Sequence, residues 1–329
     1  MLERIKGVWH LRVKKSTDGG ANWLKAVDIP NVGSPDKNHM TVDVTNSPYR
    51  NNIYVAYTDF TSFPGSPIRF SRSTNGGTSF SIPVNISGDI TSHFSQGVNL
   101  AVGPNGQVYA TWAIYDNWGE GVYGEDGVGF NKSLDGGASW QRPSRIFNIQ
   151  GIRDWWTHKN PEGEPIRVNS FPSMAVDRSG GIWNGTIYLV WTDRRYGDPD
   201  ILLSKSTDMG ATWTNPIRVN NDTLGNGKDQ WFPWITVNPY GVISIVFYDS
   251  RNDPNNQLTE VWVAQSSDGG QTFTNFRVSD MAFMPYPIPG TAYGYMGDYI
   301  GITSKIGKAY PCWMDNRNNG IYQVYTDTI

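Results

Sequence analysis

The sequence predicts an all-β protein that folds as a six-bladed β-propeller with incomplete first and last blades. Glycine and proline together supply 56 of the 329 residues (36 + 20), and aromatic residues make up 13%. This composition is typical of many short strands joined by turns. A short motif also recurs five times, with starts 57, 60, 73 and 60 residues apart. Periods of this length indicate supersecondary units that stack on one another.

The recurring motif, called the box below, has the pattern Ser-x-Asp-x-Gly-x-x-aromatic. Its copies span residues 16–23, 73–80, 133–140, 206–213 and 266–273, and the second copy carries Asn75 in place of the aspartate. A side chain of this kind accepts backbone N–H groups across a turn, and glycine adopts a positive φ at little cost. We therefore make two predictions. The aspartates hydrogen-bond the backbone of their own turns, and the box tryptophans are mostly buried. The residues concerned are Asp18, Asp135, Asp208, Asp268, Trp23, Trp140 and Trp213.

Two apolar strands precede each of the last four boxes, and the pair occurs once more after the fifth box. The first strands are expected at 40–44, 98–102, 174–176, 235–237 and 299–302. The second strands are expected at 53–57, 108–112, 187–191, 242–247 and 309–313. A third strand leads into each box and a fourth follows it, so each unit is a four-stranded antiparallel meander, the blade of a propeller.

We expect one domain, 1–329, divided into six blades. Their approximate bounds are 1–37, 38–92, 93–167, 168–229, 230–296 and 297–329. The first blade is expected to hold only its third strand (8–15), its box and its fourth strand (24–29). The last blade is expected to end after three strands, without a box.

Long, irregular loops are expected on the side of the blades opposite the boxes. In a meander, the turn between the third and fourth strands lies on one face, and the inter-blade loops lie on the other. The long loops span 30–39, 58–67, 114–127, 148–169, 220–230, 249–260 and 279–297. Irregular loops on a rigid scaffold commonly carry function, so we look for a site there.

Five such boxes in register resemble the Asp-box, or BNR repeat, of the sialidase (neuraminidase) superfamily, and the resemblance covers nearly the whole chain. It implies a sialidase-like propeller whose active site lies on the long-loop face. It also implies a glycan or glycoconjugate as the ligand and an extracellular or cell-surface location. Fold and function are separate questions, because the same repeat occurs in propellers without hydrolytic activity.

Three blades carry Asp-x-Arg at the end of the second strand. Sialidases bind the carboxylate of sialic acid with three arginines from different blades, and the resemblance makes Arg195, Arg251 and Arg317 the counterparts. The alternative is structural, with each arginine bracing the aspartate of its own turn. On that interpretation, we expect at least two of the three to be paired with a carboxylate.

The resemblance also implies a tyrosine nucleophile on the inner strand of the last blade. The segment 294–301 occupies that place, which makes Tyr295 and Tyr299 catalytic candidates and directs Asp298 toward the central axis. Alternatively, these residues pack the channel mouth, or Asp298 serves as a polar plug or a metal ligand.

Other catalytic groups of the family have no clear counterpart. The Phe/Tyr-Arg-Ile-Pro motif before the first box is absent, and no motif marks the acid/base aspartate. The residues available for the acid and its glutamate partner are Asp36, Asp59, Asp89, Glu125 and Glu260. We therefore expect weak or no hydrolysis of α-sialosides, since a glycosidase needs two groups placed together.

The long loop 148–169 contains Trp155 and Trp156. Exposed indole faces stack on sugar rings and orient a glycan without chemistry, so we consider both as binding residues. The alternative is that they cover the core.

Charge and composition exclude several other classes. The net charge of −3 gives no footprint for nucleic acid, and no apolar stretch approaches the ~20 residues of a membrane span. Cys312 is the single cysteine, and the first twenty residues lack the apolar core of a signal peptide. We expect no cofactor. The aspartate-rich turns 249–256 and 196–200 offer Ca²⁺ oxygen ligands but match no loop motif.

Three functions remain open. The first is a propeller that binds or acts on glycans through its long-loop face. The second is an active exo-glycosidase of the exo-α-sialidase type with a tyrosine nucleophile. The third is a structural or protein-binding module of a larger protein.

Overall fold

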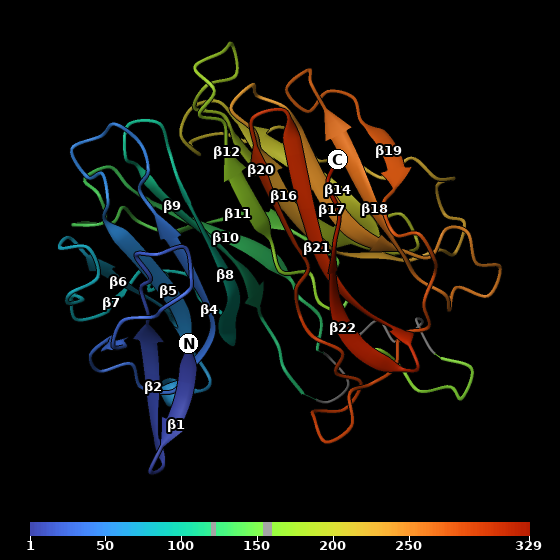
Figure 1. The fold of residues 1–329 in the computed structure, drawn as a ribbon, viewed down its shortest axis with the longest axis horizontal. Helices are drawn as coiled ribbons and strands as arrows, with labels where there is room; N and C mark the ends of the chain where they lie inside the picture. Colours follow the sequence, from blue (N-terminus) through green and yellow to red (C-terminus); the bar gives the residue numbers. More distant parts are fainter. Residues whose placement is uncertain (120–122, 154–159) are drawn as a thin grey trace. The chain divides into compact units, whose positions relative to one another are not determined.

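The computed structural model describes residues 1–119, 123–153 and 160–329. Over these residues the secondary structure is almost entirely strand. Twenty-two strands form six antiparallel sheets of three or four strands, and the one helical segment is a single 3-10 turn, Phe60–Ser62. The chain is therefore an all-β protein with the six blades of a β-propeller, of which the first and last have three strands. Within each sheet, neighbouring strands follow one another in the sequence, and Figure 1 labels most of these strands.

The chain divides into two compact units with three sheets each. The N-terminal unit comprises Met1–Asn117 and Val128–Phe147, and the C-terminal unit comprises Trp118–Gly127 and Asn148–Ile329. Each unit is described by itself below.

The N-terminal unit contains the sheets β1-β2-β3, β4-β5-β6-β7 and β8-β9-β10-β11. Their strands are β1 (Leu2–Ile5), β2 (Val8–Val13), β3 (Val27–Asp28), β4 (Pro35–Val42), β5 (Ile53–Asp59), β6 (Ile68–Ser73), β7 (Val84–Asn85), β8 (Phe94–Val102), β9 (Val108–Tyr115), β10 (Gly127–Ser133) and β11 (Ser144–Asn148).

The C-terminal unit contains the sheets β12-β13-β14-β15, β16-β17-β18-β19 and β20-β21-β22. Their strands are β12 (Ser173–Val176), β13 (Ile187–Asp193), β14 (Asp200–Ser206), β15 (Ile217–Arg218), β16 (Gln230–Val237), β17 (Ile243–Asp249), β18 (Glu260–Ser266), β19 (Thr274–Arg277), β20 (Gly301–Lys305), β21 (Lys308–Asn318) and β22 (Ile321–Thr326).

Most predicted strands are confirmed, but three first strands begin four to five residues earlier than expected. The strands β4, β8 and β16 each contain a bulge in their first half, where the pairing with the next strand shifts register. One residue at each bulge has a positive φ: Lys37 (49°), Gly97 (71°) and Phe232 (52°). A bulge interrupts the alternation of side chains, so the pattern of a half-buried strand is lost there.

The expected content of the first blade is wrong in one respect. Leu2–Ile5 forms an additional strand, β1, which pairs with β2 through a hairpin closed at Lys6 and Gly7. The segment Leu-Glu-Arg-Ile is half charged and its last two residues are exposed, so its sequence gives little strand signal.

The box prediction for the four aspartates is confirmed. Asp208 accepts the backbone N–H of Thr212 at 2.9 Å, and the Ser206 hydroxyl accepts the N–H of Gly210 at 2.8 Å. The same pattern holds Asp18, Asp135 and Asp268, with N···O distances of 2.9–3.0 Å. Asn75 replaces the aspartate and accepts the N–H of Ser79 at 3.0 Å. Each box therefore closes the turn between the last two strands of its sheet.

The box aromatics differ in how deeply they are buried. The Trp140 ring packs edge-on against Phe70 of the preceding sheet at 4.7 Å, and Phe80 packs into the cluster around Leu11. Trp140 and Trp213 are partly buried, whereas Trp23 is 61% exposed, so the prediction that it is mostly buried is wrong. The reason is positional: box aromatics pack on the preceding sheet, and no sheet precedes β1-β2-β3 in its unit.

Each unit has apolar cores between neighbouring sheets. In the C-terminal unit, one cluster joins Trp231 and Tyr248 of the fifth sheet to Ile302 and Trp313 of the sixth. In the part of the chain that the structure describes, no helix has the length and apolar character needed to span a bilayer.

Candidate functional site

The arginine of the fifth sheet, Arg251, pairs with the aspartate of its own turn and also donates to Asn221 of the preceding blade at 2.7 Å. Arg251 donates from its backbone N–H and from Nε to the two oxygens of Asp249, each at 2.7 Å. Its guanidinium lies over the Trp262 ring at 4.1 Å and reaches Asn275 at 3.3 Å. Because Trp262 is on β18 and Asn275 on β19, the guanidinium points toward the later strands of the sheet and away from β16.

The other two arginines repeat this arrangement. Arg195 donates to the buried Asp193 at 2.5 Å. Arg317 donates to Asp315 at 2.6 Å and to Asp280, and its guanidinium lies over the Tyr325 ring at 4.3 Å. The expectation that at least two of these arginines are paired with carboxylates is confirmed for all three. In each case the paired aspartate lies two residues before the arginine.

The three candidates of the segment 294–301 lie beside the segment before β12. Asp298 is only 4% exposed. Its carboxylate accepts the Arg167 guanidinium at 3.2 and 3.5 Å and the Asn169 amide at 3.5 Å. The buried carboxylate thus has a cation and an amide as neighbours, which offsets the cost of removing it from water.

Tyr295 is fixed on the other side of the same arginine. The Arg167 guanidinium stacks over the Tyr295 ring at 4.4 Å, and the Arg167 N–H donates to the Gly294 carbonyl at 2.8 Å. Gly294 has φ +71°, and a Cβ there would lie 2.8 Å from the Pro165 carbonyl oxygen. Glycine is therefore required for this close approach.

Tyr299 belongs to an aromatic group. Its ring lies 6.1 Å from Trp234, almost perpendicular at 88°, and 6.4 Å from Phe171. Tyr299 is 44% exposed, so part of the ring faces solvent. Phe171 and Tyr299 lie in the loops just before the first strands β12 and β20, and Trp234 lies within the first strand β16.

We call this group the inner-strand cluster. It consists of Arg167, Asn169, Phe171, Trp234, Tyr295, Asp298 and Tyr299, all in the C-terminal unit. The structure brings the three candidates Tyr295, Asp298 and Tyr299 into one cluster and adds four further residues to them. Arg167 sits between apolar residues in the run Pro-Ile-Arg-Val-Asn, an alternation that marks a charged side chain on one face, but its partner is 131 residues away.

Two binding candidates, Trp155 and Trp156, lie outside the described residues. Their predicted role in glycan binding stays a prediction.

The glutamate candidates have structural partners. Glu125 is 2% exposed and accepts the backbone N–H groups of Ser170 at 3.0 Å and Arg153 at 3.1 Å, which ties two loops of the C-terminal unit together. Glu260 accepts from Arg277 at 2.7 Å and from the Trp262 indole N–H at 3.0 Å.

The aspartate candidates of the N-terminal unit are also paired. Asp36 accepts the Gln96 amide at 2.7 Å. Asp59 accepts Arg69 at 3.3 Å, and Asp89 forms a surface pair with Arg142 at 3.2 Å.

Carboxylates of the aspartate-rich turns make contacts within the protein. Within residues 1–119, 123–153 and 160–329, no group of three or more His, Cys, Asp or Glu side chains is arranged to hold a metal ion. Instead, Asp200 accepts Arg218 at 2.5 Å and Asn220 at 2.8 Å. Burial raises the pKa of Asp200 and of Asp249, the latter to about 6.

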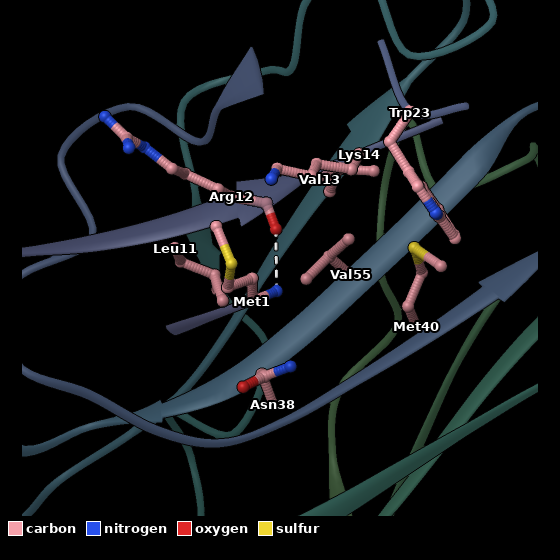
Figure 2. Close-up of a pocket in the computed structure, with 9 residues that line it drawn as sticks. All are labelled: Met1, Leu11, Arg12, Val13, Lys14, Trp23, Asn38, Met40 and Val55. Carbon is pink, nitrogen blue, oxygen red and sulfur yellow. Dashed lines mark hydrogen bonds between the residues drawn. The ribbon is translucent and has the colours of Figure 1, made fainter. Parts of the chain in front are cut away.

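A pocket of about 480 Å³ lies in the N-terminal unit between β2 and the strands β4 and β5. Figure 2 shows Leu11, Val13 and Val55 around it, with the Arg12 guanidinium directed away from the other residues. The Met1 ammonium group donates to the Arg12 carbonyl at 2.7 Å. The walls are mostly apolar and no charged side chains converge, so the pocket does not have the chemistry of a catalytic site.

No protein-family model matches the chain, and no curated protein sequence matches it. Solved structures do match the chain in fold. An α-L-arabinanase of Penicillium chrysogenum, complexed with arabinobiose, has 14% identity and a TM-score of 0.55 over 89% of this chain and 80% of its own. An ulvan lyase of polysaccharide lyase family 25 has 12% identity and a TM-score of 0.54 over 96% and 69%. The fold is the one these enzymes share.

An α-L-arabinofuranosidase of Fusarium graminearum gives the same result, with 11% identity and a TM-score of 0.52 over 90% of this chain and 98% of its own. Sialidase structures are also similar, with 10–15% identity and TM-scores of 0.49. At these identities the comparisons show the fold alone. The similar proteins are propellers that act on different glycans.

Proposed function

We propose that this chain is a glycan-binding β-propeller, that the inner-strand cluster is its binding site, and that it hydrolyses α-sialosides weakly or not at all. The observation that carries the proposal is the partly exposed Tyr299, flanked by Trp234 and Phe171 and next to the buried Asp298. Aromatic faces pack on the C–H faces of sugar rings, and a few fixed polar groups orient the hydroxyls.

The location of the cluster supports this function. Its residues stand where the long loops enter the first strands, on the side opposite the boxes. Hydrogen bonds from Arg167 to the Gly294 carbonyl and to the Asp298 carboxylate hold the two loops of the site together before a ligand arrives, which reduces the ordering cost of binding. A protein that binds glycans through such a site fits an extracellular or cell-surface location, which we propose with it.

The same cluster argues against efficient hydrolysis. Glycoside hydrolysis commonly uses two carboxyl groups, about 5–5.5 Å apart in retaining enzymes and about 6.5–9.5 Å apart in inverting ones. Asp298 is the one carboxylate of the seven cluster residues, and Arg167 already pairs with it. A tyrosine nucleophile would need a separate acid. The glutamate candidates have other partners, because Glu125 accepts the Ser170 N–H and Glu260 accepts the Arg277 guanidinium.

Binding is tested with Tyr299→Ala. Removing the exposed ring should weaken the binding of an oligosaccharide such as arabinobiose by about tenfold or more, measured by titration calorimetry, because the aromatic platform is lost. Tyr240→Ala is the matched control, since Tyr240 is 68% exposed on a turn at the box end of the fifth sheet. Equal affinity of Tyr299→Ala and the parent would refute the proposed site.

A further inference from the structure

The charges of the inner-strand cluster cancel within the protein. The Arg167 and Asp298 side chains are 17% and 1% exposed, and they lie 3.2 Å apart. One face of the guanidinium is covered by Tyr295 at 4.4 Å. Asn169 gives Asp298 a further donor at 3.5 Å. A sugar carboxylate would need a cation as its partner. The cation of this site, Arg167, is already paired with the Asp298 carboxylate.

An anionic sugar would meet two obstacles here. To reach Arg167 it must displace Asp298, which would leave a buried carboxylate without its cation. Without displacement, the two negative charges would share one arginine in a weakly hydrated site, where like charges repel strongly.

The three repeat arginines offer no alternative. The aspartates that hold Arg195, Arg251 and Arg317 have fully buried side chains. Freeing any of these arginines for a ligand would again leave a buried, unpaired carboxylate, and two of the guanidinium groups are stacked on aromatic rings as well. A carboxylate-binding triad would require arginines whose charge is open to the ligand.

From this charge balance we infer that the site selects neutral oligosaccharides and discriminates against sugars that carry a carboxylate, such as sialic acid and uronic acids. The inference rests on the proposed function and adds the class of ligand. A neutral sugar needs only the Tyr299 face and hydroxyl contacts to fixed polar groups, and it leaves the Arg167–Asp298 pair intact.

The test compares matched neutral and acidic sugars by titration calorimetry on the whole chain. The neutral probes are arabinobiose and galactobiose, and the acidic probes are digalacturonate and sialyllactose. We expect a neutral probe to bind at least tenfold more tightly than either acidic probe, with little change between low and high salt. Tighter, salt-sensitive binding of an acidic probe would overturn the inference while leaving the proposed function standing. No binding of any of the four probes would overturn both.

Two variants that change the charge of the Arg167–Asp298 pair test whether this pair causes the preference for neutral sugars. Asp298→Asn leaves Arg167 without its carboxylate, so we expect the affinity for digalacturonate to rise by about tenfold, because a charge-assisted hydrogen bond becomes available to the ligand. The double variant Arg167→Gln with Asp298→Asn is neutral again and should return to weak binding of digalacturonate. Circular dichroism checks that both variants keep the strand spectrum. If digalacturonate binds the folded single and double variants equally, the ion pair is not the cause.

Discussion

At the scale of the residue, the boxes show how one side chain fixes a turn. The Asp208 carboxylate accepts the hydroxyl of Thr212 at 2.5 Å and its backbone N–H at 2.9 Å. These bonds, with that of the Ser206 hydroxyl, hold the pKa of Asp208 at about 2, below the ordinary value of 3.8. The hydrogen bonds favour the charged form, so the folded chain holds this proton less tightly than the unfolded chain.

The sign of the pH effect follows directly. The stability that Asp208 contributes is present above about pH 4 and is lost as the pH falls through about 2. Asp208→Asn removes the titration, so the free energy of unfolding of the variant should fall less than that of the parent between pH 4 and pH 2. Urea unfolding at several pH values measures this. Asn75, at the same position of the second box, shows that the turn accepts an amide. Parallel pH curves for the variant and the parent would contradict the assignment.

At the scale of the element, two box aromatics of the N-terminal unit, Phe80 and Trp140, pack on the sheet before their own. Trp140→Ala should lower the free energy of unfolding by about 3 kcal/mol, near the lower end for large aromatic truncations because the ring is partly buried. Trp23→Ala is the matched control, with the same residue at the same box position of the same unit. Because Trp23 is 61% exposed, its loss should stay below about 1 kcal/mol. Equal losses in urea unfolding would show that the two rings have the same environment.

A histidine links two first strands within the N-terminal unit. The Leu100 N–H on β8 donates to Nδ1 of His39 on β4 at 3.1 Å, which requires that nitrogen to be unprotonated. Burial of the imidazole lowers the pKa of His39 to about 4. The folded pKa lies below the unfolded value of about 6.5, so stability should fall as the pH drops from 6.5 toward 4.

This link is tested with His39→Asn, which keeps a short acceptor and removes the titration. We expect the difference in unfolding free energy between parent and variant to shrink as the pH is lowered from 7 to 4, because only the parent loses stability through this group. A difference that is constant with pH would show that His39 does not titrate in this window.

Repetition explains how much of these elements could be predicted. Five boxes in register placed the third and fourth strands, and the apolar pairs before them placed the second strands within a few residues. The strand β1 was missed because it is short and half charged, and the early halves of β4, β8 and β16 were missed because bulges break their alternation. A sequence repeat predicts only the features that all blades share. The strand β1 and the bulges occur only in particular blades, so the repeat does not predict them.

At the scale of the whole molecule, the site is less predictable than the fold. Tyr295, Asp298 and Tyr299 entered through a resemblance, whereas Arg167 and Trp234 join them only through the folded chain. The Arg167–Asp298 pair spans 131 residues and two sheets, and a single sequence carries no signal for such a contact. The Asp-x-Arg repeats were more predictable, since a pattern repeated at the same place in three blades favoured a structural role, and each arginine pairs with the aspartate two residues before it.

Catalysis by a propeller also belongs to this scale, because its acid, nucleophile and charge-stabilising groups come from different sheets. On a fluorogenic α-sialoside we expect turnover near background. The repeat arginines are engaged by their own aspartates, and the loss of one electrostatic group alone costs roughly 10²–10³ in rate. The decisive variants are Tyr295→Phe and Tyr299→Phe. Robust turnover in the parent that disappears in one of them would identify the nucleophile and reverse our conclusion. Background rates in all three proteins, with oligosaccharide binding retained in the parent, are what a binding propeller requires.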